Sequence, residues 1–411
     1  MGKPKIRFKG FTEEWEQRKL GEIVERITRK NQDLVSTLPL TISAQYGLID
    51  QNEFFDKRVA SKDVSGYYLV KKGEFAYNKS TSSDAPWGAV KRLDRYENGV
   101  LSTLYIVFAI NENAEIDSDY LVTYYDTDLW HRGIREIASE GARNHGLLNI
   151  APADFFETSL SVPQDIEEQK AIGKYFTELN ALITLHQRKC DETKKLKKYM
   201  LQKMFPQNGM KVPEIRFEGF TGDWEQRKLI DVCDYVDYRG KTPTKIDCGI
   251  FLVTAKNVKA GYIDYESSKE YISEDNYEEV MHRGKPKIGD VLITTEAPCG
   301  NVAQVDSSNI ALAQRIIKYR GHKNEIDNTY LKHYMLAPHF QKLLFEKSSG
   351  GTVQGIKGSI LHQQYVMYPR YAEQVKIGQY LDTLDHLITL HQRKRDELVK
   401  IKKYMLQNMF V

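Results

Sequence analysis

The sequence has little cysteine, and it has no long apolar run. Its four cysteines among 411 residues are widely spaced and form no C-x-x-C pair, which argues against a disulfide scaffold. A zinc site built from Cys233, Cys248, Cys299 and His282 is an alternative, but free thiols are the simpler interpretation. No stretch approaches the roughly 18 apolar residues that span a bilayer, and no signal peptide is apparent. We therefore expect a cytoplasmic protein without a membrane partner.

Motifs of familiar enzyme classes are also missing. The run 239–242 (RGKT) ends like a phosphate-binding loop, but Tyr235 stands where the earlier glycine would be required. No G-x-G-x-x-G, H-E-x-x-H or G-x-S-x-G pattern occurs, and no Asn/Asp-Pro-Pro-Tyr/Phe tetrad supports amino-methyltransferase chemistry. We therefore expect no catalytic residue, no metal and no cofactor in this chain.

An internal repeat is the strongest feature present. Residues 4–20 (PKIRFKGFTEEWEQRKL) and 213–229 (PEIRFEGFTGDWEQRKL) are identical at thirteen of seventeen positions. Residues 167–206 and 372–411, 205 positions apart, are identical at 25 of 40 positions. A period this long indicates a domain duplication and not a solenoid. The blocks between the matched segments have diverged, so we expect them to share a fold and to do different jobs.

The repeated closing segments are predicted to be long helices. Apolar side chains recur every three or four residues over about three heptads, and no proline interrupts either segment. Forty helical residues span roughly 60 Å, too long for one small core, so we expect the two helices to pair antiparallel as a coiled coil. The residues expected to pair them are Ile172, Phe176, Leu179, Ile183, Ile377, Leu381, Leu384 and Ile388.

Polar residues around these helices are matched as well, for example 185–189 with 390–394 (LHQRK in both). An apolar seam alone does not require that, so we expect an outer surface that binds one kind of partner twice. The candidate docking residues are Leu182, Arg188, Lys189, Tyr199, Leu387, Arg393, Lys394 and Tyr404.

The fold class that we expect is α+β, with a pseudo-two-fold arrangement. The predicted parts are a first globular domain (1–164), a first helix (165–206), a second globular domain (207–370) and a second helix (371–411). Strand-like runs occupy 101–110, 291–295 and 310–319, and helix-like stretches occupy 119–132 and 328–345.

Charge is distributed unevenly. The chain carries 59 Lys and Arg against 56 Asp and Glu, a formal net charge of +3, and 28% of its residues are charged. The two repeated helical segments carry +4 and +2, so the remainder carries −3. Because counterion release by basic residues supplies most non-specific DNA affinity, the globular blocks would bind DNA only through local loops, with partners adding to the grip.

Polar and aromatic clusters in the predicted loops carry the side chains that read base edges and grip phosphates. The alternative interpretation is that they are ordinary solvated loops. The candidate DNA-binding residues are Lys79, Ser80, Thr81, Ser82, Trp87, Arg143, Asn144, His145, Tyr238, Arg239, Lys241, Thr242, Lys256, Asn257, Thr294, Thr295, Glu296, Gln314, Arg315, Gln354 and Lys357.

Three features together resemble the specificity subunit of a type I restriction-modification system. They are the repeated header at 4–20 and 213–229, the helix entries with Pro163 and Pro369 ahead of Glu-Gln pairs, and the helix endings that read KKYMLQ-x-MF. The resemblance covers the whole chain and implies two target recognition domains, each reading half of a bipartite, asymmetric double-stranded DNA site. It also implies that the helices set the spacer and dock two methyltransferase subunits that methylate adenine at N6, and that two motor-nuclease subunits join. S-adenosylmethionine, ATP and Mg²⁺ are then expected on the partner subunits, and this chain is not itself catalytic.

A second hypothesis is a coiled-coil scaffold whose end domains bind proteins. The headers and matched helices fit it equally well, but it does not require the polar loop clusters. Sequence-specific retention on DNA by the reconstituted complex would separate the two. An undetected enzyme is a third reading, for which the sequence offers no catalytic constellation.

Overall fold

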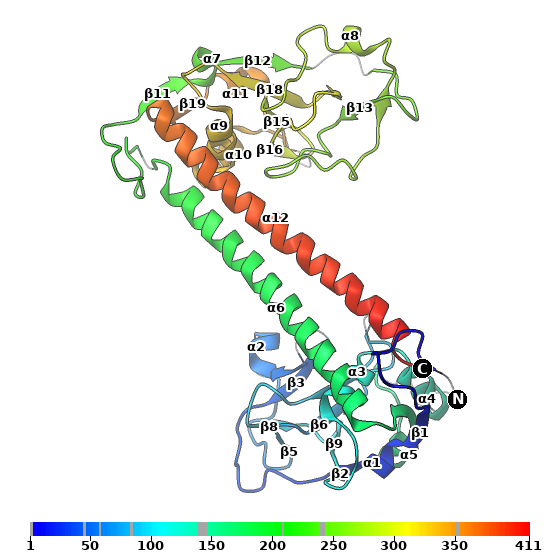
Figure 1. Ribbon diagram of the computed structural model, residues 1–411. Helices are drawn as coiled ribbons and strands as arrows, with labels where there is room; N and C mark the ends of the chain where they lie inside the picture. The colour runs from blue at the N-terminus through cyan, green and yellow to red at the C-terminus, as the bar shows by residue number, and fades with distance from the viewer. Residues whose placement is uncertain are drawn as a thin grey trace. The chain divides into compact units, whose positions relative to one another are not determined.

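The computed structural model describes residues 3–43, 47–56, 59–82, 85–138, 146–207, 209–238, 243–350 and 354–411. The chain divides into two compact units. Unit 1 contains Met1–Leu185 together with Arg395–Val411, and unit 2 contains His186–Lys394. The expected mixture of helix and sheet is confirmed in both (Figure 1).

The strands of unit 1 are β1 (Trp15–Lys19), β2 (Val24–Ile27), β3 (Leu40–Ser43), β4 (Gly47–Asp50), β5 (Tyr68–Lys71), β6 (Phe75–Asn78), β7 (Ala89–Arg92), β8 (Asn98–Leu101), β9 (Ile106–Ile110) and β10 (Ser159–Pro163). Those of unit 2 are β11 (Glu225–Lys228), β12 (Cys233–Asp237), β13 (Ile250–Val253), β14 (Tyr271–Ile272), β15 (Val291–Thr295), β16 (Cys299–Gln304), β17 (Ile310–Leu312), β18 (Ile316–Gly321) and β19 (Tyr365–Tyr368).

A four-stranded sheet organises each unit. Its order is β2-β9-β6-β7 in unit 1 and β12-β18-β15-β16 in unit 2, and all its pairs are antiparallel. A two-stranded antiparallel sheet closes each unit, β1-β10 in one and β11-β19 in the other. Corresponding strands take corresponding places, so the diverged blocks keep a common framework. The remaining sheets differ: β3-β4 and β5-β8 in unit 1, and β14-β13-β17 in unit 2.

The helices of unit 1 are α1 (Leu20–Ile23), α2 (Gln51–Phe55), α3 (Ser118–Tyr125), α4 (Trp130–Ile137) and α5 (Pro152–Phe156). Those of unit 2 are α7 (Leu229–Val232), α8 (Tyr277–Val280), α9 (Asn328–Leu336), α10 (Pro338–Lys347) and α11 (Gly358–His362). The two predicted helix stretches were wrong in one respect, because each is two helices. The chain breaks at 126–129 in one and at Ala337 in the other, where Pro338 starts the next helix.

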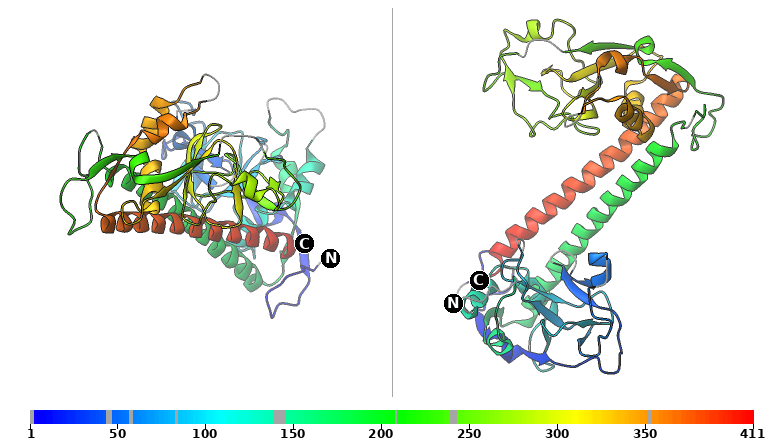
Figure 2. Two further views of the ribbon diagram at one scale, coloured as in Figure 1. Left: turned by 90° about the horizontal axis from the view of Figure 1, so that it is seen from above. Right: turned by 180° about the vertical axis from the view of Figure 1, so that it is seen from behind.

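The repeated segments form α6 (Ile166–Lys203) and α12 (Tyr371–Asn408), each a single unbroken helix of 38 residues (Figures 1 and 2). They begin soon after Pro163 and Pro369, as predicted. The Asp165 side chain accepts a hydrogen bond from the backbone N–H of Glu167 at 2.8 Å, so it caps the first turn of α6. Among the described residues, no helix is both long enough and apolar enough to cross a membrane.

Two predicted strand runs were also wrong in their continuity. The run 101–110 breaks at 102–105, and the run 310–319 breaks at 313–315. In the second break Arg315 adopts a left-handed backbone with φ of 69°, which ends one strand and starts the next. The third run, 291–295, is one strand, as predicted.

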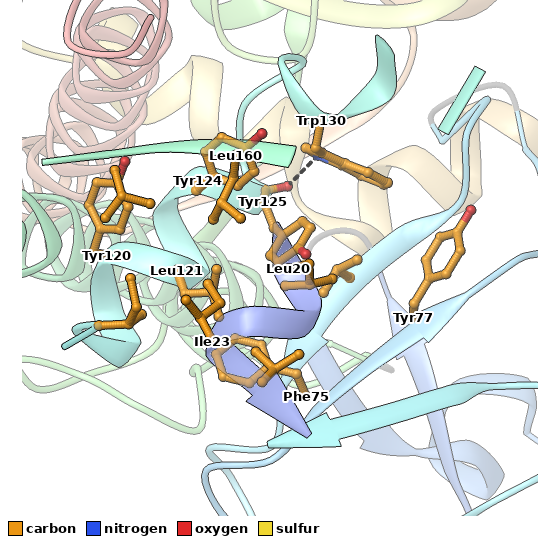
Figure 3. Packing of buried hydrophobic residues seen from close by; sticks show 14 of the residues in the cluster. Leu20, Ile23, Phe75, Tyr77, Tyr120, Leu121, Tyr124, Tyr125, Trp130 and Leu160 are labelled. Carbon is orange, nitrogen blue, oxygen red and sulfur yellow. Dashed lines mark hydrogen bonds between the residues drawn. The ribbon is translucent and has the colours of Figure 1, made fainter. Parts of the chain in front are cut away.

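The core of unit 1 is built from aromatic residues of the sheet, α3, α4 and α5 (Figure 3). The Tyr77 ring stacks on Phe155, and the indole N–H of Trp130 donates to the Tyr125 carbonyl at 3.1 Å. The end of α12 joins this core: the Phe410 ring lies 5.9 Å from Trp15 and 5.7 Å from Tyr120. The chain's last residues therefore complete its first unit.

The core of unit 2 is completed in the matching way by the end of α6. The Phe205 ring lies 5.6 Å from Tyr330 and 6.4 Å from Trp224. Phe205 and Phe410 are both almost fully buried. Phe205 follows α6, which begins in unit 1, and it completes the core of unit 2. Phe410 follows α12, which begins in unit 2, and it completes the core of unit 1.

The repeated headers are held by repeated ion pairs. The Arg7 guanidinium makes two contacts with the Glu168 carboxylate, at 2.6 and 2.7 Å. Arg216 makes the same two contacts with Glu373, at 2.7 and 2.8 Å. Both carboxylates are 1% exposed, and a two-point arginine–carboxylate pair fixes orientation as well as distance. The matched header residues therefore anchor the start of α6 and of α12.

A second repeated contact joins each long helix to the short helix beside it. The Gln169 side-chain oxygen accepts from the backbone N–H of Asp117, and Gln374 accepts from Asp327, both at 2.9 Å. Asp117 and Asp327 are the N-caps of α3 and α9. The same architecture therefore recurs at both helix starts.

Candidate nucleic-acid interface

In unit 1 the loop after β6 carries five of the candidate DNA-binding residues, Lys79, Ser80, Thr81, Ser82 and Trp87. It pairs with the segment that begins at Gly146: the Thr81 backbone N–H and hydroxyl donate to the Gly146 carbonyl at 2.7 and 3.0 Å. Ser80 forms a bridge with Leu147. The candidates Arg143, Asn144 and His145 lie outside the described residues, directly before this segment. Ser80 and Thr81 thus lie beside the segment that begins at Gly146, about 65 residues away in the chain.

The side chains of this loop divide into exposed and anchored ones. Ser80 and Ser82 are exposed. The Lys79 ammonium donates to the Ile150 carbonyl at 3.3 Å, and burial lowers the pKa of this lysine. Trp87 is half-buried against the core, and its carbonyl accepts from the Tyr77 hydroxyl at 2.9 Å. The two serines are therefore the candidates that this geometry presents most openly.

In unit 2, four candidates are buried and hold the loops in place. Tyr238 is 7% exposed and its hydroxyl donates to the Gly284 carbonyl. The Asn257 amide accepts from Thr254 and donates to the carbonyls of Asp264 and Ser268 at 2.8 Å. Thr294 and Thr295 are buried in β15. These side chains shape the recognition loops rather than form their surface. Arg239, Lys241 and Thr242 lie outside the described residues.

Other candidates in unit 2 gather around one cavity of about 350 Å³. Lys256, Gln314 and Arg315 line it, from segments almost 60 residues apart. Lys245 and Glu270, which the sequence did not single out, line it too and form a salt bridge of 2.7 Å. Lys245 could not be selected from the sequence, because only the fold brings it close to Arg315.

The last candidates of unit 2 reach the same loop cluster from another direction. The Arg315 guanidinium lies 3.3 Å from the Glu296 carboxylate. Glu296 forms a bridge with Gly355, and the Ile356 N–H donates to the Thr295 carbonyl at 2.9 Å. Gln354 and Lys357, which flank this contact, are exposed. The structure therefore brings 296, 315 and 354–357 together at the end of β15. Such a cluster offers donors and acceptors of the kind that contact base edges and phosphates.

The expected helix-pairing residues are buried or half-buried. Ile172, Phe176 and Leu179 join the core of unit 1, together with Leu398 of α12 and Met409, which directly follows α12. Ile377, Leu381 and Leu384 join the core of unit 2, with Met204 from the end of α6. The apolar helix-pairing residues therefore pack both against the globular part of their unit and against the other long helix.

Within unit 2 the two helices make direct contacts with an antiparallel order. His186 meets His391 with their Nδ1 atoms 3.0 Å apart, Cys190 approaches the Ile388 carbonyl at 3.8 Å, and Lys197 pairs with Asp385 at 2.5 Å. Burial, the facing His391 and two nearby lysines lower the pKa of His186.

Most of the candidate docking residues are exposed. Leu182 is 45% exposed, Tyr199 49% and Tyr404 58%, whereas Leu387 is half-buried. Arg188, Lys189, Arg393 and Lys394 are also exposed. Within unit 1, α12 borders a cavity of about 370 Å³ between Val399–Phe410 and the break at 126–129. Lys402 stands at this groove and pairs with Asp126 at 2.8 Å; sequence reasoning missed this groove.

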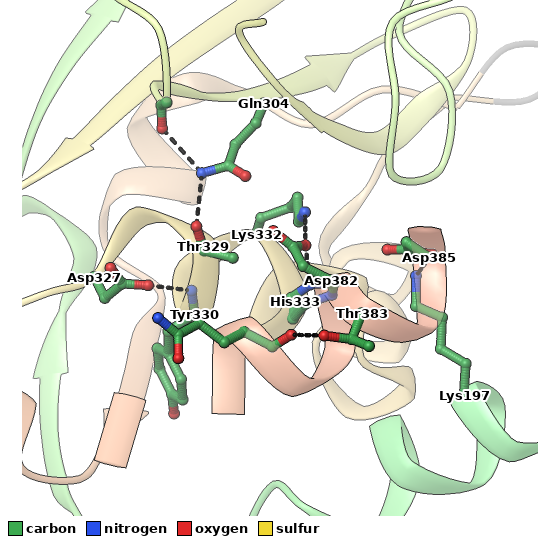
Figure 4. A network of polar contacts seen from close by, with 12 residues as sticks. Lys197, Gln304, Asp327, Thr329, Tyr330, Lys332, His333, Asp382, Thr383 and Asp385 are labelled. Carbon is green, nitrogen blue, oxygen red and sulfur yellow. Dashed lines mark hydrogen bonds and ion pairs between the residues drawn. The ribbon is translucent and has the colours of Figure 1, made fainter. Parts of the chain in front are cut away.

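One cluster in the described part of the chain has metal-ligand chemistry. His333, Asp382 and Asp385 bring their potential ligand atoms within 4.8 Å of one another (Figure 4). However, Lys332 pairs with Asp382, and Lys197 pairs with Asp385. Two ammonium groups already balance the two carboxylates, so we interpret the cluster as a salt-bridge network that joins α9, α12 and α6 within unit 2. The four cysteines are free thiols.

Comparisons with known proteins agree with this geometry. Residues 221–400 match the family model described as the type I restriction modification DNA specificity domain. The chain is 22% identical to the putative type I restriction enzyme MjaX specificity subunit of Methanocaldococcus jannaschii, over 96% of this chain and 92% of that protein. It is 23% identical to the MjaVIII specificity subunit of the same organism, over 75% of this chain and 73% of that protein.

A solved structure shows the shared fold. The crystal structure of a type I restriction-modification system S subunit from M. genitalium matches with a TM-score of 0.62 at 14% identity, covering 100% of this chain and 99% of that one. The chain is therefore similar to type I restriction-modification specificity subunits over nearly its whole length, and its residues 221–400 match the DNA specificity domain of that family.

Proposed function

We propose that this chain is the non-catalytic DNA-recognition subunit of a type I restriction-modification complex. Unit 1 reads one half of a bipartite, asymmetric double-stranded DNA site, and unit 2 reads the other half. The helices α6 and α12 pair as an antiparallel coiled coil, set the spacer between the half-sites and dock two methyltransferase subunits. Those subunits use S-adenosylmethionine to methylate adenine at N6, and two motor-nuclease subunits supply the reactions that need ATP and Mg²⁺.

One observation carries this proposal: the matched residues anchor the long helices or lie exposed on them, whereas the candidate DNA-binding loops lie in the unmatched blocks. Arg7–Glu168 and Arg216–Glu373 build the same helix anchor twice, while Tyr199 and Tyr404 stand exposed on both helices. Identical partners require identical docking surfaces, and different half-sites require different loops. A protein-binding scaffold would explain the matched helix surfaces, but it would not explain why the loops of the two units differ.

The net charge outside the repeated helical segments suggests that partner subunits supply part of the DNA affinity. The sequence outside the repeated helical segments carries a net −3, whereas proteins that bind DNA tightly by themselves usually present a basic surface. Exposed cations do occur locally, at Lys256, Arg315 and Lys357. We therefore expect the isolated chain to bind DNA weakly and the complex with methyltransferase to bind it tightly.

The docking role is tested by co-expressing the chain with the type I methyltransferase subunit of the same genome and measuring the mass of the complex by native mass spectrometry. We expect one copy of this chain with two copies of methyltransferase. The double variant L182D/L387D should lose both methyltransferase copies. Because Leu182 is exposed, a charge at this position should cost the fold about 0.5 kcal/mol or less.

The matched control is Ala181→Asp, an exposed neighbour that points away from Leu182 around the helix and is not repeated, since His386 stands at the equivalent position. It should leave the 2:1 complex intact. A double variant that still binds two methyltransferase copies would mean that docking uses another face. A complex that assembles but never discriminates between DNA sequences would favour the scaffold function.

A further inference from the structure

The two units place different side chains at one equivalent position of their loops, and strand register defines that position. Phe75 of β6 pairs with Phe108 of β9, and Val291 of β15 pairs with Tyr319 of β18. These strands hold the same places in the two four-stranded sheets. Four residues before Phe108 and Tyr319 stand Leu104 and Arg315, both in the break that precedes the central strand.

Both side chains are exposed although they flank a buried strand. Leu104 is 56% exposed, and the Arg315 side chain is 54% exposed. Ile106, two residues after Leu104, and Ile316, directly after Arg315, are buried. The breaks therefore leave Leu104, next to the exposed Thr103, and Arg315 facing outward at equivalent positions of the two units. Neither Leu104 nor Arg315 is buried in the core of its own unit.

The backbone at Arg315 is held in an uncommon conformation. Its φ of 69° is left-handed, which costs a residue with a Cβ roughly 1–2 kcal/mol. The Arg315 carbonyl accepts from the Thr295 N–H at 2.8 Å, and the guanidinium lies 3.3 Å from Glu296. Strained backbone persists where the surroundings hold it and is concentrated at functional sites. Two contacts with β15 and the residue after it thus aim this side chain.

The surroundings of Arg315 suit a nucleic acid. It lines the cavity of about 350 Å³ with Gln314, Lys245 and Lys256. Lysine side chains at the rim attract phosphates. Arginine offers two donors to the O6 and N7 of guanine, and glutamine offers one donor and one acceptor to the N7 and N6 of adenine in the major groove. A guanidinium has five N–H donors, more than a single contact to Glu296 occupies.

We propose that positions 315 and 104 are specificity-determining residues of the two units. Arg315 reads a guanine in the half-site of unit 2 through the O6 and N7 edge, and Leu104 makes apolar contact with a thymine methyl group in the half-site of unit 1. This inference rests on the proposed function, since it requires that each unit read one half-site.

The test maps N6-methyladenine by long-read sequencing in DNA modified by the complex with methyltransferase, first for the wild type and then for R315L and L104R. R315L should lower methylation of the wild-type site by about tenfold to a hundredfold and lose the preference for guanine at one position of one half-site. L104R should change one position of the other half-site and leave the first half-site unchanged.

Two further variants make the result specific. R315K keeps the charge but loses the planar two-point geometry, so it should also lose the guanine preference. Lys342→Ala, at a side chain that is 77% exposed on α10, should leave rate and motif unchanged. Each variant is first shown to bind methyltransferase at the wild-type ratio, which confirms that it folds.

The outcomes separate the inference from the function beneath it. If the wild type methylates a bipartite motif while R315L keeps every base preference, the inference is wrong and the proposed function stands. A uniform fall in rate with an unchanged motif also overturns it, because that result describes a phosphate contact. A wild-type complex that methylates no bipartite motif overturns both.

Discussion

Gly173 shows at the scale of one residue why the two repeats kept the same amino acid. A Cβ at this position would lie 2.7 Å from the Tyr120 backbone nitrogen, and one at Gly378 would lie 3.0 Å from that of Tyr330. Each glycine lets its long helix approach the N-terminus of the neighbouring short helix. Each glycine is the eighth residue of its helix, and only the packing explains why it recurs.

Gly173→Ala should therefore destabilise unit 1. Because the added methyl group meets backbone atoms that cannot rotate away, we expect a loss of about 1–3 kcal/mol, measured as the free energy of unfolding in urea. The matched control is Gly133→Ala in α4, where the new Cβ meets only the Thr158 side chain, at 3.3 Å. There the gain in helix propensity, up to about 1 kcal/mol, offsets the contact. Equal losses at both positions would contradict this account.

Residue type alone determined which candidate site residues could be predicted from the sequence. Arg315 and Lys256 were predicted as candidates from their residue type, and the structure places both at one cavity. Asn257 was predicted for the same reason, yet its amide is fully used within its own loop. Amino-acid type does not distinguish a side chain that holds a loop from one that the loop presents. Only the fold makes that distinction.

At the scale of elements, long regular patterns were predicted correctly and their interruptions were not. The bounds of α6 and α12 follow from an uninterrupted heptad pattern between prolines. The breaks at 102–105 (Ser-Thr-Leu-Tyr) and 313–315 (Ala-Gln-Arg) contain no glycine or proline that would mark an interruption in the sequence. The backbone there is set by cross-strand contacts such as Thr295 to Arg315, which act between residues 20 positions apart.

The junction of α9 with α12 gives the second prediction, which concerns pH. Burial lowers the pKa of His333 to about 4, even though its Nε2 contacts Asp382 at 2.8 Å; Lys332 and Lys197 lower it further. Its pKa in the unfolded chain is near the ordinary 6.5. The unfolded state therefore takes up the proton first as the pH falls, and stability is lost between about pH 6.5 and pH 4.

The measurement compares urea unfolding of the wild type and His333→Gln at pH 7.5 and pH 5.0. The wild type should lose about 2 kcal/mol at this histidine by pH 5, and the variant should be less sensitive by that amount whatever its stability at pH 7.5. His339, whose pKa burial also lowers to about 4, contributes equally to both proteins. Identical pH dependence would show that His333 is not buried neutral in the folded state. The pKa of Asp382, held at about 2 by His333 and Lys332 against the effect of burial, adds a loss only below pH 4.

At the scale of the whole molecule, each unit contains parts of the chain from both sequence repeats. Unit 1 needs Arg395–Val411, and unit 2 needs the part of α6 from His186 onward. The phenylalanines that close the two cores, Phe410 and Phe205, come from identical sequence motifs 205 positions apart. The duplication could be read from the sequence, but this exchange of closing residues could not, because it depends on where each helix ends.

Because Phe410 packs in unit 1 and Phe205 packs in unit 2, replacing either one should loosen a different unit. Phe410→Ala should cost about 3–5 kcal/mol and accelerate hydrogen exchange in β1 and α3, which belong to the unit at the opposite end of the sequence. Phe205→Ala should accelerate exchange in α7 and α9 and leave β1 protected. Each variant serves as the control for the other. If Phe410→Ala loosens β11 and β19 instead, the assignment of the C-terminal segment to unit 1 is wrong.

The central claim is that two units with one framework read two different half-sites. It is tested most directly by expressing the wild-type chain with its methyltransferase partner and mapping N6-methyladenine across plasmid DNA by long-read sequencing. We predict one motif made of two unlike halves separated by a spacer of fixed length, with one methylated adenine on each strand. A complex that assembles normally but yields scattered methylation, or a motif without two halves, would contradict the account.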